Sequence, residues 1–360
     1  MSDEVPAVRL GALAPLTRPG WAEAGRHLLA GLELAAADVN DSGGIGGRPL
    51  DLVVRDTAAD PQRAVAAVDE LADLGVAALA GEYHSVVARA AAARADARGV
   101  PFLCSSAVLD ALTEEPTDWV ARLSPPQSRG WRAYADFLLD AGHRRIAVAA
   151  EPSVYWASGT RILRDRLASR GGGVTELDAR ALAPEAVCDA LAGHRATALL
   201  LLTGFPEPAV PIVASVRRDA RLTDVLIGAP AGQPEFAAWA EPLGEAGAAV
   251  PFLRYLPGRL GPLGERVGTA LRTRLGAAPS FVAYEGYDAV TVLAGMLRAH
   301  GTDRARLAAA WAGVAVEGTR GEIRFSRPPG GRVWQWAGAP VQVVDRDPAA
   351  PGRFRVRHTA

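Results

Sequence analysis

Hydroxyl and aromatic side chains recur directly after the short apolar runs of this 360-residue chain. Apolar runs of about four to eight residues are typical of buried strands. The side chains in this position are Thr17, Tyr83, Ser85, Ser105, Ser106, Tyr155, Trp156 and Phe205. Ligands of open parallel α/β sheets bind at the carboxyl ends of the strands. We therefore predict that these residues line a binding site for a small molecule.

The sequence offers little for catalysis. It contains no Gly-x-Ser-x-Gly, no P-loop, and no histidine or cysteine spacing that is typical of a metal site. His84 and Ser85 are adjacent in sequence, which does not make their side chains converge. All 39 basic residues are arginine, which excludes Schiff-base and P-loop lysine chemistry. We predict a protein that is no enzyme and holds no metal or cofactor.

The elements that position these residues alternate between strand and helix. The first strand, Val8–Ala14, is followed by a helix near Trp21–Asn40 whose apolar residues recur every three or four positions. Gly43, Gly44, Gly46 and Gly47 come after that helix and before the strand Leu50–Val54. A nucleotide loop needs the glycines before its helix, so we interpret these glycines as a turn. Further strands are predicted at Val76–Ala80 and Val100–Cys104, with helices at Gln62–Leu74 and up to Arg98.

The same alternation starts again after Ser124–Gln127, where two prolines indicate a linker. The second series is predicted as helix Ser128–Ala141, strand Arg145–Ala150, helix Gly159–Arg170, strand Gly173–Leu177, helix Pro184–Ala192, strand Ala198–Leu202, helix Ala209–Asp219 and strand Val225–Gly228. Two long helices follow, at Pro262–Leu275 and Phe281–His300, and Gly330-Gly331 indicates a hairpin. The predicted fold class is α/β, with two doubly wound units that each contain a parallel sheet.

Net charge and hydropathy restrict the binding partners of the protein and its location in the cell. The net charge of -1 gives no general attraction to nucleic acid. No apolar stretch reaches the ~18 residues of a membrane span, and the first residues lack the apolar core of a secretory signal. As written, the sequence predicts a cytoplasmic protein without membrane insertion. Prior removal of a signal would instead make it extracytoplasmic.

Several segments together resemble the type I periplasmic binding protein superfamily, in particular its leucine-binding-protein-like group. They are LGALAPLTRPG, AAADVNDSGGIGGRPLDLVVRDTAADPQRAV, GEYHSVVARAAAARADARGVPFLCSSA, YEGYDAVTVLAGML and GEIRFS. The resemblance covers nearly the whole chain. It implies two lobes joined by three crossovers, with a ligand cleft between lobes that closes by a hinge. The N-terminal lobe would hold residues 8–124 plus about 252–322, and the C-terminal lobe 125–251 plus about 323–360.

The resemblance assigns roles to part of the predicted site. Ser85 matches the serine that binds the ligand carboxylate, and the residue type also suits an N-cap of the following helix. In the next loop Ser106 offers a hydroxyl, while Val108 stands where a threonine is usual. Tyr155 matches the stacking tyrosine, with Trp156 beside it.

Farther along the chain the match is poorer. Phe205 matches a second aromatic residue but lacks the phenol oxygen, and Ala231 stands where the group has its ammonium-binding glutamate. A buried ammonium without a carboxylate costs several kcal/mol. Glu82, Glu151 and Glu235 are candidate substitutes, and each is equally typical of a solvated loop charge.

We therefore predict a ligand with an anionic or amide head on Ser85 and Ser106. Its apolar or aromatic body would lie against Tyr155, Trp156 and Phe205. The resemblance implies the solute-binding component of an ABC importer, with a permease as partner. The alternative is a cytoplasmic ligand-sensing regulator on the same fold, similar to amide sensors and working with a regulatory partner. A repressor of the LacI type is disfavoured, because the chain starts at its first strand and leaves no headpiece.

Overall fold

The protein forms two compact units, seen here in a computed structural model that describes residues 6–113, 117–327 and 333–360. Unit 1 comprises Met1–Pro126 and Arg259–Pro340, and unit 2 comprises Gln127–Gly258 and Val341–Ala360. The chain thus passes between the units three times. Both units are α/β with parallel strands, which confirms the predicted fold class.

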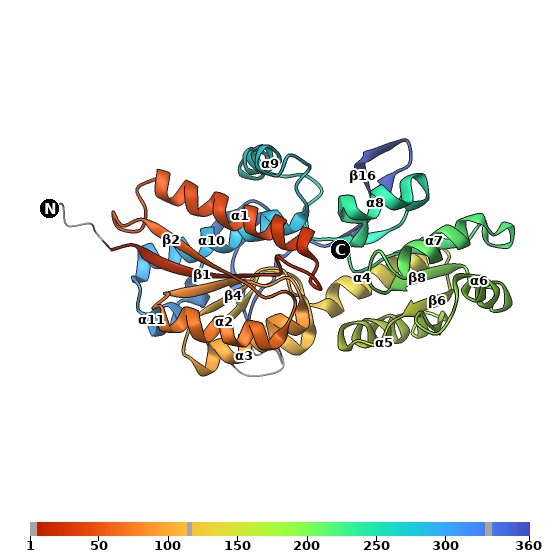
Figure 1. The fold of residues 1–360 in the computed structure, drawn as a ribbon, viewed down its shortest axis with the longest axis horizontal. Helices are drawn as coiled ribbons and strands as arrows, with labels where there is room; N and C mark the ends of the chain where they lie inside the picture. The colour runs from red at the N-terminus through yellow and green to blue at the C-terminus, as the bar shows by residue number, and fades with distance from the viewer. Residues whose placement is uncertain (1–5, 114–116, 328–332) are drawn as a thin grey trace. The chain divides into compact units, whose positions relative to one another are not determined.

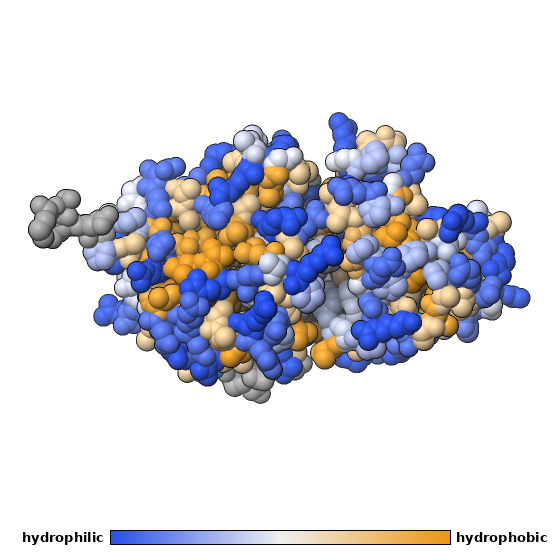
Figure 2. Space-filling view, in the orientation of Figure 1, coloured by the Kyte–Doolittle hydropathy of each residue, from blue (hydrophilic) through white to orange (hydrophobic). Residues whose placement is uncertain are grey.

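Unit 1 is built around a sheet with the strand order β13-β14-β5-β4-β3-β1-β2. Its strands are β1 (Val8–Ala14), β2 (Leu50–Asp56), β3 (Ala78–Gly81), β4 (Phe102–Cys104), β5 (Val120–Arg122), β13 (Phe325–Ser326) and β14 (Trp334–Trp336). All neighbours are parallel except β13 and β14. At the β2 edge, Leu52, Val53 and Val54 are only half-buried, and Figure 2 shows apolar surface around the position of this strand.

Helices cover both faces of this sheet. They are α1 (Ala22–Asp41), α2 (Pro61–Asp73), α3 (Ser85–Ala97), α9 (Pro262–Leu275), α10 (Phe281–His300) and α11 (Arg304–Ala309). Figure 1 shows α1 and α10 side by side on one face, and α2 with α3 on the other. A Cβ atom on Gly31 would lie 1.9 Å from the carbonyl oxygen of Ala283, and one on Gly286 would lie 2.3 Å from that of Leu28. Glycine at both positions therefore lets α1 and α10 pack backbone against backbone.

Unit 2 repeats the doubly wound order with fewer strands. Its parallel sheet has the order β7-β6-β8-β9, formed by β6 (Arg145–Ala150), β7 (Gly173–Asp178), β8 (Ala198–Leu202) and β9 (Leu226–Gly228). Its helices are α4 (Gln127–Asp140), α5 (Val154–Ala168), α6 (Pro184–Gly193), α7 (Ala209–Arg218) and α8 (Ala237–Leu243). In each unit the second strand lies on one side of the first strand and the third strand lies on the other, so the strand order reverses there. Ligands of such sheets bind beside this point of reversal.

Antiparallel strands and short 3₁₀ turns complete the units. Unit 2 has a second sheet, β10-β15-β16, made of β10 (Phe252–Arg254), β15 (Gln342–Asp347) and β16 (Ala350–Thr359). In unit 1, β11 (Val316–Gly318) pairs with β12 (Gly321–Ile323). The 3₁₀ turns are Asp110–Thr113, Ala220–Leu222, Gln233–Glu235, Gly244–Gly247 and Trp311–Gly313.

The unit boundaries differ from the expected lobes at two places. Residues 252–258 lie in unit 2, because β10 pairs with β15. Residues 323–340 lie in unit 1, because β14 pairs with β5 and extends the first sheet. The expected hairpin around Gly330-Gly331 has its two strands, β13 and β14, but the glycines themselves lie outside the described residues.

The structure confirms the turn at the glycine cluster and corrects one helix. Gly43, Gly44, Gly46 and Gly47 all have positive φ angles, which any other residue would adopt at a cost. The predicted helix Gly159–Arg170 instead begins at Val154. Tyr155 and Trp156 therefore lie in the first turn of α5 and not in a polar loop.

Candidate functional site

A carboxylate at the end of β2 organises the loop that follows β1. Asp56 Oδ1 accepts hydrogen bonds from the amides of Leu16 at 2.7 Å, Thr17 at 3.3 Å and Ala58 at 2.8 Å. Its other oxygen accepts the Thr17 hydroxyl at 2.5 Å. Burial acts to raise the pKa of Asp56, but these hydrogen bonds outweigh it and hold the pKa below its usual value. Thr17, one of the predicted site residues, thus stabilises this exposed loop through its hydrogen bonds to Asp56.

A second carboxylate, Glu82, follows β3 and is fully buried. Its Oε1 accepts the amides of Tyr83 and His84, each at 2.8 Å, and its Oε2 accepts the Thr57 hydroxyl at 2.7 Å. Burial raises the pKa of Glu82 to about 7, although the three hydrogen bonds act in the opposite direction. The sequence interpretation of Glu82 as a solvated loop charge is therefore wrong.

Ser85 begins α3 and fastens the loop after β4. The predicted N-cap role is wrong, because His84 is the N-cap residue and its side chain makes no capping bond. Ser85 Oγ instead accepts the amides of Val108 at 3.2 Å and Leu109 at 3.3 Å. Since the oxygen accepts both bonds, the hydroxyl hydrogen of Ser85 stays available to donate.

Ser105 and Ser106 follow β4 and are buried, with their hydroxyl oxygens 3.2 Å apart. Ser124 follows β5, just before the chain leaves unit 1, and its hydroxyl oxygen lies 2.7 Å from the carbonyl oxygen of Ser105 and 2.8 Å from Glu285 Oε1. One hydroxyl hydrogen can serve only one of these acceptors. A proton on Glu285 would complete both hydrogen bonds, because the carboxyl group could then donate to Ser124.

Glu285 belongs to a buried cluster of charges between α10 and the β11–β12 hairpin. Arg320 pairs with Glu285 at 3.2 Å and with Asp288 at 2.8 Å, and all three side chains have no exposed surface. Asp288 also accepts the amide and the hydroxyl of Thr319. Burial raises the pKa of Glu285 to about 7, and the Arg320 charge lowers it in part. Glu285 also hydrogen-bonds the Ser106 side chain, so this cluster contacts the serine pair directly.

Three rings lie beside the start of α3. Trp21 and Tyr83 meet edge to face with their centroids 6.1 Å apart, and Tyr83 meets His84 in the same way at 5.3 Å. The amide of Trp21 donates to His84 Nε2 at 3.1 Å. Burial lowers the pKa of His84 to about 4, so the ring is neutral at pH 7. His84 is thus engaged with Trp21, a residue that the sequence analysis did not select.

The matching edge of unit 2 is aromatic. Ser153 caps α5 by accepting the Trp156 amide at 3.2 Å, which fixes the first turn of the helix. There Tyr155 packs edge to face on Trp131 at 5.9 Å and on Trp156 at 4.8 Å between ring centroids. Burial raises the pKa of Tyr155, so its phenol stays protonated. After β8, the half-buried Phe205 packs on the fully buried Trp239 at 5.3 Å.

Ala231 is half-buried in the loop after β9, and the acids near it already have partners. Glu235 is buried and forms an ion pair with Arg254 at 2.9 Å, so interpreting it as a solvated charge is wrong. Glu151 accepts the amide of Gly204 and pairs with Arg180 at 3.4 Å. Neither acid is free to take the place of a glutamate at position 231.

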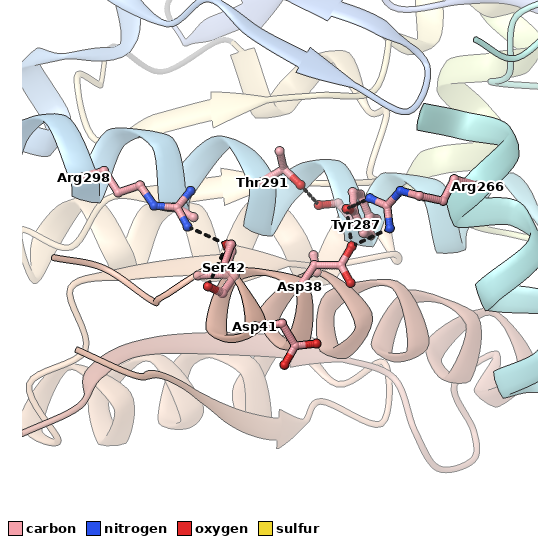
Figure 3. A pocket seen from close by; sticks show the side chains of 10 residues that line it. Asp38, Asp41, Ser42, Arg266, Tyr287, Thr291 and Arg298 are labelled. Carbon is pink, nitrogen blue, oxygen red and sulfur yellow. Dashed lines mark hydrogen bonds and ion pairs between the residues drawn. The ribbon is translucent and has the colours of Figure 1, made fainter. Parts of the chain in front are cut away.

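A separate groove lies elsewhere in unit 1, between α1, α9 and α10, with a volume of about 500 Å³ (Figure 3). At one end the Tyr287 hydroxyl donates to Asp38 at 2.7 Å, and Arg266 bonds to both. At the other end Arg298 donates to the Ser42 hydroxyl and to the carbonyl oxygen of Gly44. Because α1 runs antiparallel to the strands, its last turns lie far from the carboxyl ends of β1 and β3. The groove is therefore distinct from the predicted site.

Both cysteines, Cys104 and Cys188, are free and buried. Across residues 6–113, 117–327 and 333–360 there is no group of three or more metal-ligating side chains. Over the same ranges no helix combines the length and the apolar character that crossing a membrane requires.

The comparisons with known proteins agree with this architecture. A family model described as a periplasmic binding protein matches residues 7–345. The Leu/Ile/Val-binding protein of Escherichia coli (strain K12) is 27% identical over 180 residues, which are 49% of this chain and 48% of that protein. The curated relatives are matched over only part of their own length, 34% for a Brucella abortus homologue and 48% for the E. coli protein.

Solved structures with a similar fold cover nearly the whole chain. A leucine-binding protein LivK from Thermotoga maritima has a TM-score of 0.81 at 20% identity and covers 98% of each chain. An ABC transporter solute-binding protein from R. palustris, in complex with benzoate, has a TM-score of 0.79 at 19% identity, over 98% of this chain and 96% of that one. The family match extends over most of the sequence. The chain therefore belongs to the periplasmic binding protein family, in its type I, leucine/isoleucine/valine-binding-protein-like group.

Proposed function

We propose that this protein is the solute-binding component of an ABC importer. Its ligand is a small apolar or aromatic molecule with a carboxylate or amide head and no free ammonium group. The family supports the role, since its members are substrate-binding proteins. The R. palustris structure supports the ligand class, because a protein of this fold holds benzoate.

The head group is assigned to unit 1. The first turn of α3 has no side-chain cap, so its amides and the positive end of the helix dipole favour an acceptor atom. Ser85 adds a hydroxyl hydrogen at the same place, because its oxygen is used by Val108 and Leu109. Ser106, from the next loop, has a hydroxyl that already interacts with Ser105 and Glu285, so it would be shared between these neighbours and the ligand. These donors suit the oxygen atoms of a carboxylate or an amide equally well.

The body of the ligand is assigned to the aromatic edge of unit 2. Tyr155, Trp156 and Phe205 are each half-buried and each packs against another ring. Because neighbouring rings hold these three side chains in place, their free faces favour contact with an aromatic or branched apolar group of the ligand.

One observation carries the proposal against a free amino acid as ligand. Position 231 is alanine, and Glu151 and Glu235 are both ion-paired within unit 2. In unit 1, Glu82 has both oxygens engaged by internal donors. An ammonium group would enter without a carboxylate partner, at a cost of several kcal/mol.

Isothermal calorimetry with benzoate, benzamide, leucine and isoleucine tests this proposal. We expect an aromatic acid or amide to bind at least ~10-fold more tightly than leucine, which corresponds to ~1.4 kcal/mol. The Ala231→Glu variant should gain affinity for leucine, and the matched neutral variant Ala231→Gln should not. Tight leucine binding by the unchanged protein would contradict the proposal. Chromatography of the recovered ligand should show it chemically unaltered.

Phe205→Ala tests the aromatic part of the assignment. Loss of the ring should weaken benzoate ~10-fold, because a stacked aromatic pair contributes ~0.5–1.5 kcal/mol beyond its buried area. Phe205→Tyr retains the ring and serves as the control. Equal benzoate affinity in Phe205→Ala and the unchanged protein would remove Phe205 from the site.

A further inference from the structure

We propose that Glu82 sets the head-group specificity of unit 1: a carboxylate binds there only with uptake of a proton by Glu82, whereas an amide binds without it. The inference rests on the proposed function, because it places the head group beside Ser85. Glu82 is a positioning residue in this account and need not touch the ligand.

The surroundings of Glu82 are unusual for a buried carboxylate. Its side chain has no exposed surface, and three donors hold it: the Thr57 hydroxyl and the amides of Tyr83 and His84. Buried carboxylates normally have a cationic partner. Among the described residues Glu82 has no ion pair.

The neighbouring strands carry one cation to consider, Arg122 of β5, which acts on Cys104 and donates to Gln335 and to the carbonyl oxygens of Val108 and Leu109. From β2 the adjacent titratable group is the Asp56 carboxylate, which is itself negative and raises the pKa of Glu82. From β4 it is the Cys104 thiol, whose pKa burial raises to about 12. In its own loop it is His84, whose Nε2 accepts the Trp21 amide and which is neutral at pH 7. Glu82 and Asp56 are thus two neighbouring acids, and the causes that shift their pKa values include no cation.

Glu82 also occupies donors that an anionic ligand would use. The amides of Tyr83 and His84 directly precede α3, and the Glu82 carboxylate already binds both. A ligand carboxylate at Ser85 would be a third negative charge in a small, mostly buried volume. Like charges at short range favour protonation of one of them. Burial already places the pKa of Glu82 at about 7, so a nearby anion shifts the equilibrium at neutral pH.

The link between carboxylate binding and proton uptake by Glu82 has a definite sign. Bound carboxylate raises the proton affinity of Glu82, so affinity for a carboxylate falls as the pH rises above about 7, by at most ~10-fold for each pH unit. A neutral amide leaves the proton affinity of Glu82 nearly unchanged. Its affinity should therefore be flat over the same range.

The first experiment is calorimetry with benzoate and benzamide from pH 6 to 9, on the unchanged protein, Glu82→Gln and Glu265→Gln. Glu265 is an exposed glutamate of α9 and serves as the control. We expect benzoate affinity to fall with pH in the unchanged protein and in Glu265→Gln, and to be flat in Glu82→Gln. Equal pH dependence for benzoate and benzamide, or a dependence that persists in Glu82→Gln, overturns the inference. Binding of benzoate with no pH dependence also overturns it, and leaves the proposed function intact.

The second experiment needs no ligand, so it tests proton uptake by Glu82 separately from the proposed function, even if neither probe binds. Since the pKa of Glu82 is raised from 4.5 to about 7 in the folded protein, the stability it contributes is fully present below about 4.5 and lost as the pH rises to about 7. Urea denaturation should show that the unchanged protein loses stability relative to Glu82→Gln between pH 4.5 and 8. A difference between these two proteins that does not change with pH would show that Glu82 takes up no proton, and would overturn the inference.

Discussion

The two units share a strand order but differ in the side chains at the carboxyl ends of their strands. In unit 1 these positions carry buried acids and hydroxyls, with Glu82 and Ser85 as examples. In unit 2 they carry rings, such as Tyr155 and Phe205, and the acids there are paired with arginine. One topology thus supports a polar edge in one unit and an apolar edge in the other.

This difference shows that loop residues, and not the sheet, decide the chemistry of each edge. Buried acids in unit 1 cost free energy unless they are paired or protonated, so unit 1 should respond to pH. The packed rings in unit 2 have no charge to titrate. The stability of unit 2 should therefore depend on the volume of these buried side chains and not on pH. Substitutions in each unit can test this contrast.

The largest effect is expected for Arg320→Met in unit 1. It leaves the buried carboxylates of Glu285 and Asp288 without their cation, which should lower the free energy of unfolding by ~3–5 kcal/mol. Because the pKa of Glu285 is already raised to about 7, the loss should be smaller at pH 5, where Glu285 binds a proton, than at pH 8. Chemical denaturation at both pH values measures it.

The control for this variant is Arg324→Met, which removes an exposed arginine paired with Glu322. Exposed pairs contribute little, so this variant should behave like the unchanged protein. A destabilisation by Arg320→Met that is the same at pH 5 and pH 8 would contradict the electrostatic account of unit 1.

The second-largest loss of stability is expected for Trp239→Phe in unit 2. The substitution removes the indole donor to the carbonyl oxygen of Gly247, at 3.0 Å, and part of a fully buried ring that supports Phe205. We expect a loss of ~2 kcal/mol. Unlike the loss in unit 1, it should not change between pH 5 and pH 8. A clear pH dependence would break the contrast between the units.

A smaller effect is expected for Ser85→Ala. The amides of Val108 and Leu109 lose their acceptor, which should cost ~1–3 kcal/mol of stability. Hydrogen exchange at these two amides should speed up, while exchange in unit 2 stays unchanged. Ser169→Ala, which removes an exposed hydroxyl of unit 2, is the matched control. Unchanged protection of both amides in Ser85→Ala would show that Ser85 does not hold the loop.

The smallest effect is expected for Tyr287→Phe in the groove of Figure 3. The hydroxyl joins Asp38 on α1 to Arg266 on α9, and its loss should cost ~1 kcal/mol, because water can replace it in an open groove. Ligand affinity should stay the same, since the groove is distinct from the predicted site. A change in benzoate affinity would show that the groove and the site are coupled.

Most of the fold could be predicted because it rests on local patterns. The strands Arg145–Ala150 and Ala198–Leu202 and the helices Pro262–Leu275 and Phe281–His300 have the predicted bounds. The sequence does not reveal β5, which has three residues, because such a short strand carries no periodic signal. Nor does it reveal β15 and β16. The pairing of β15 with β10 joins segments far apart in sequence, which no local pattern reveals, and β16 pairs with β15.

Less of the site could be predicted, because partners lie far along the chain. Helix α5 starts at Val154 and not at the expected Gly159, because Ser153 caps it. Trp21 and Arg320 were not selected, although one contacts the loop after β3 and the other pairs with Glu285. For Ser85 the sequence does carry a signal, its place before an alanine-rich helix, and the structure places Ser85 at the start of α3.

The sequence by itself determined the order of the elements, the turn at Gly43–Gly47 and the alanine at position 231. These follow from spacing and residue type, which act over a few positions. Tertiary structure alone decided that Glu82 is buried without a cation and that Glu235 is paired with Arg254. It also decided that Ser85 holds a neighbouring loop and does not cap its own helix. Burial and charge pairing depend on groups brought together from distant strands, and they set the pKa of buried acids such as Glu82.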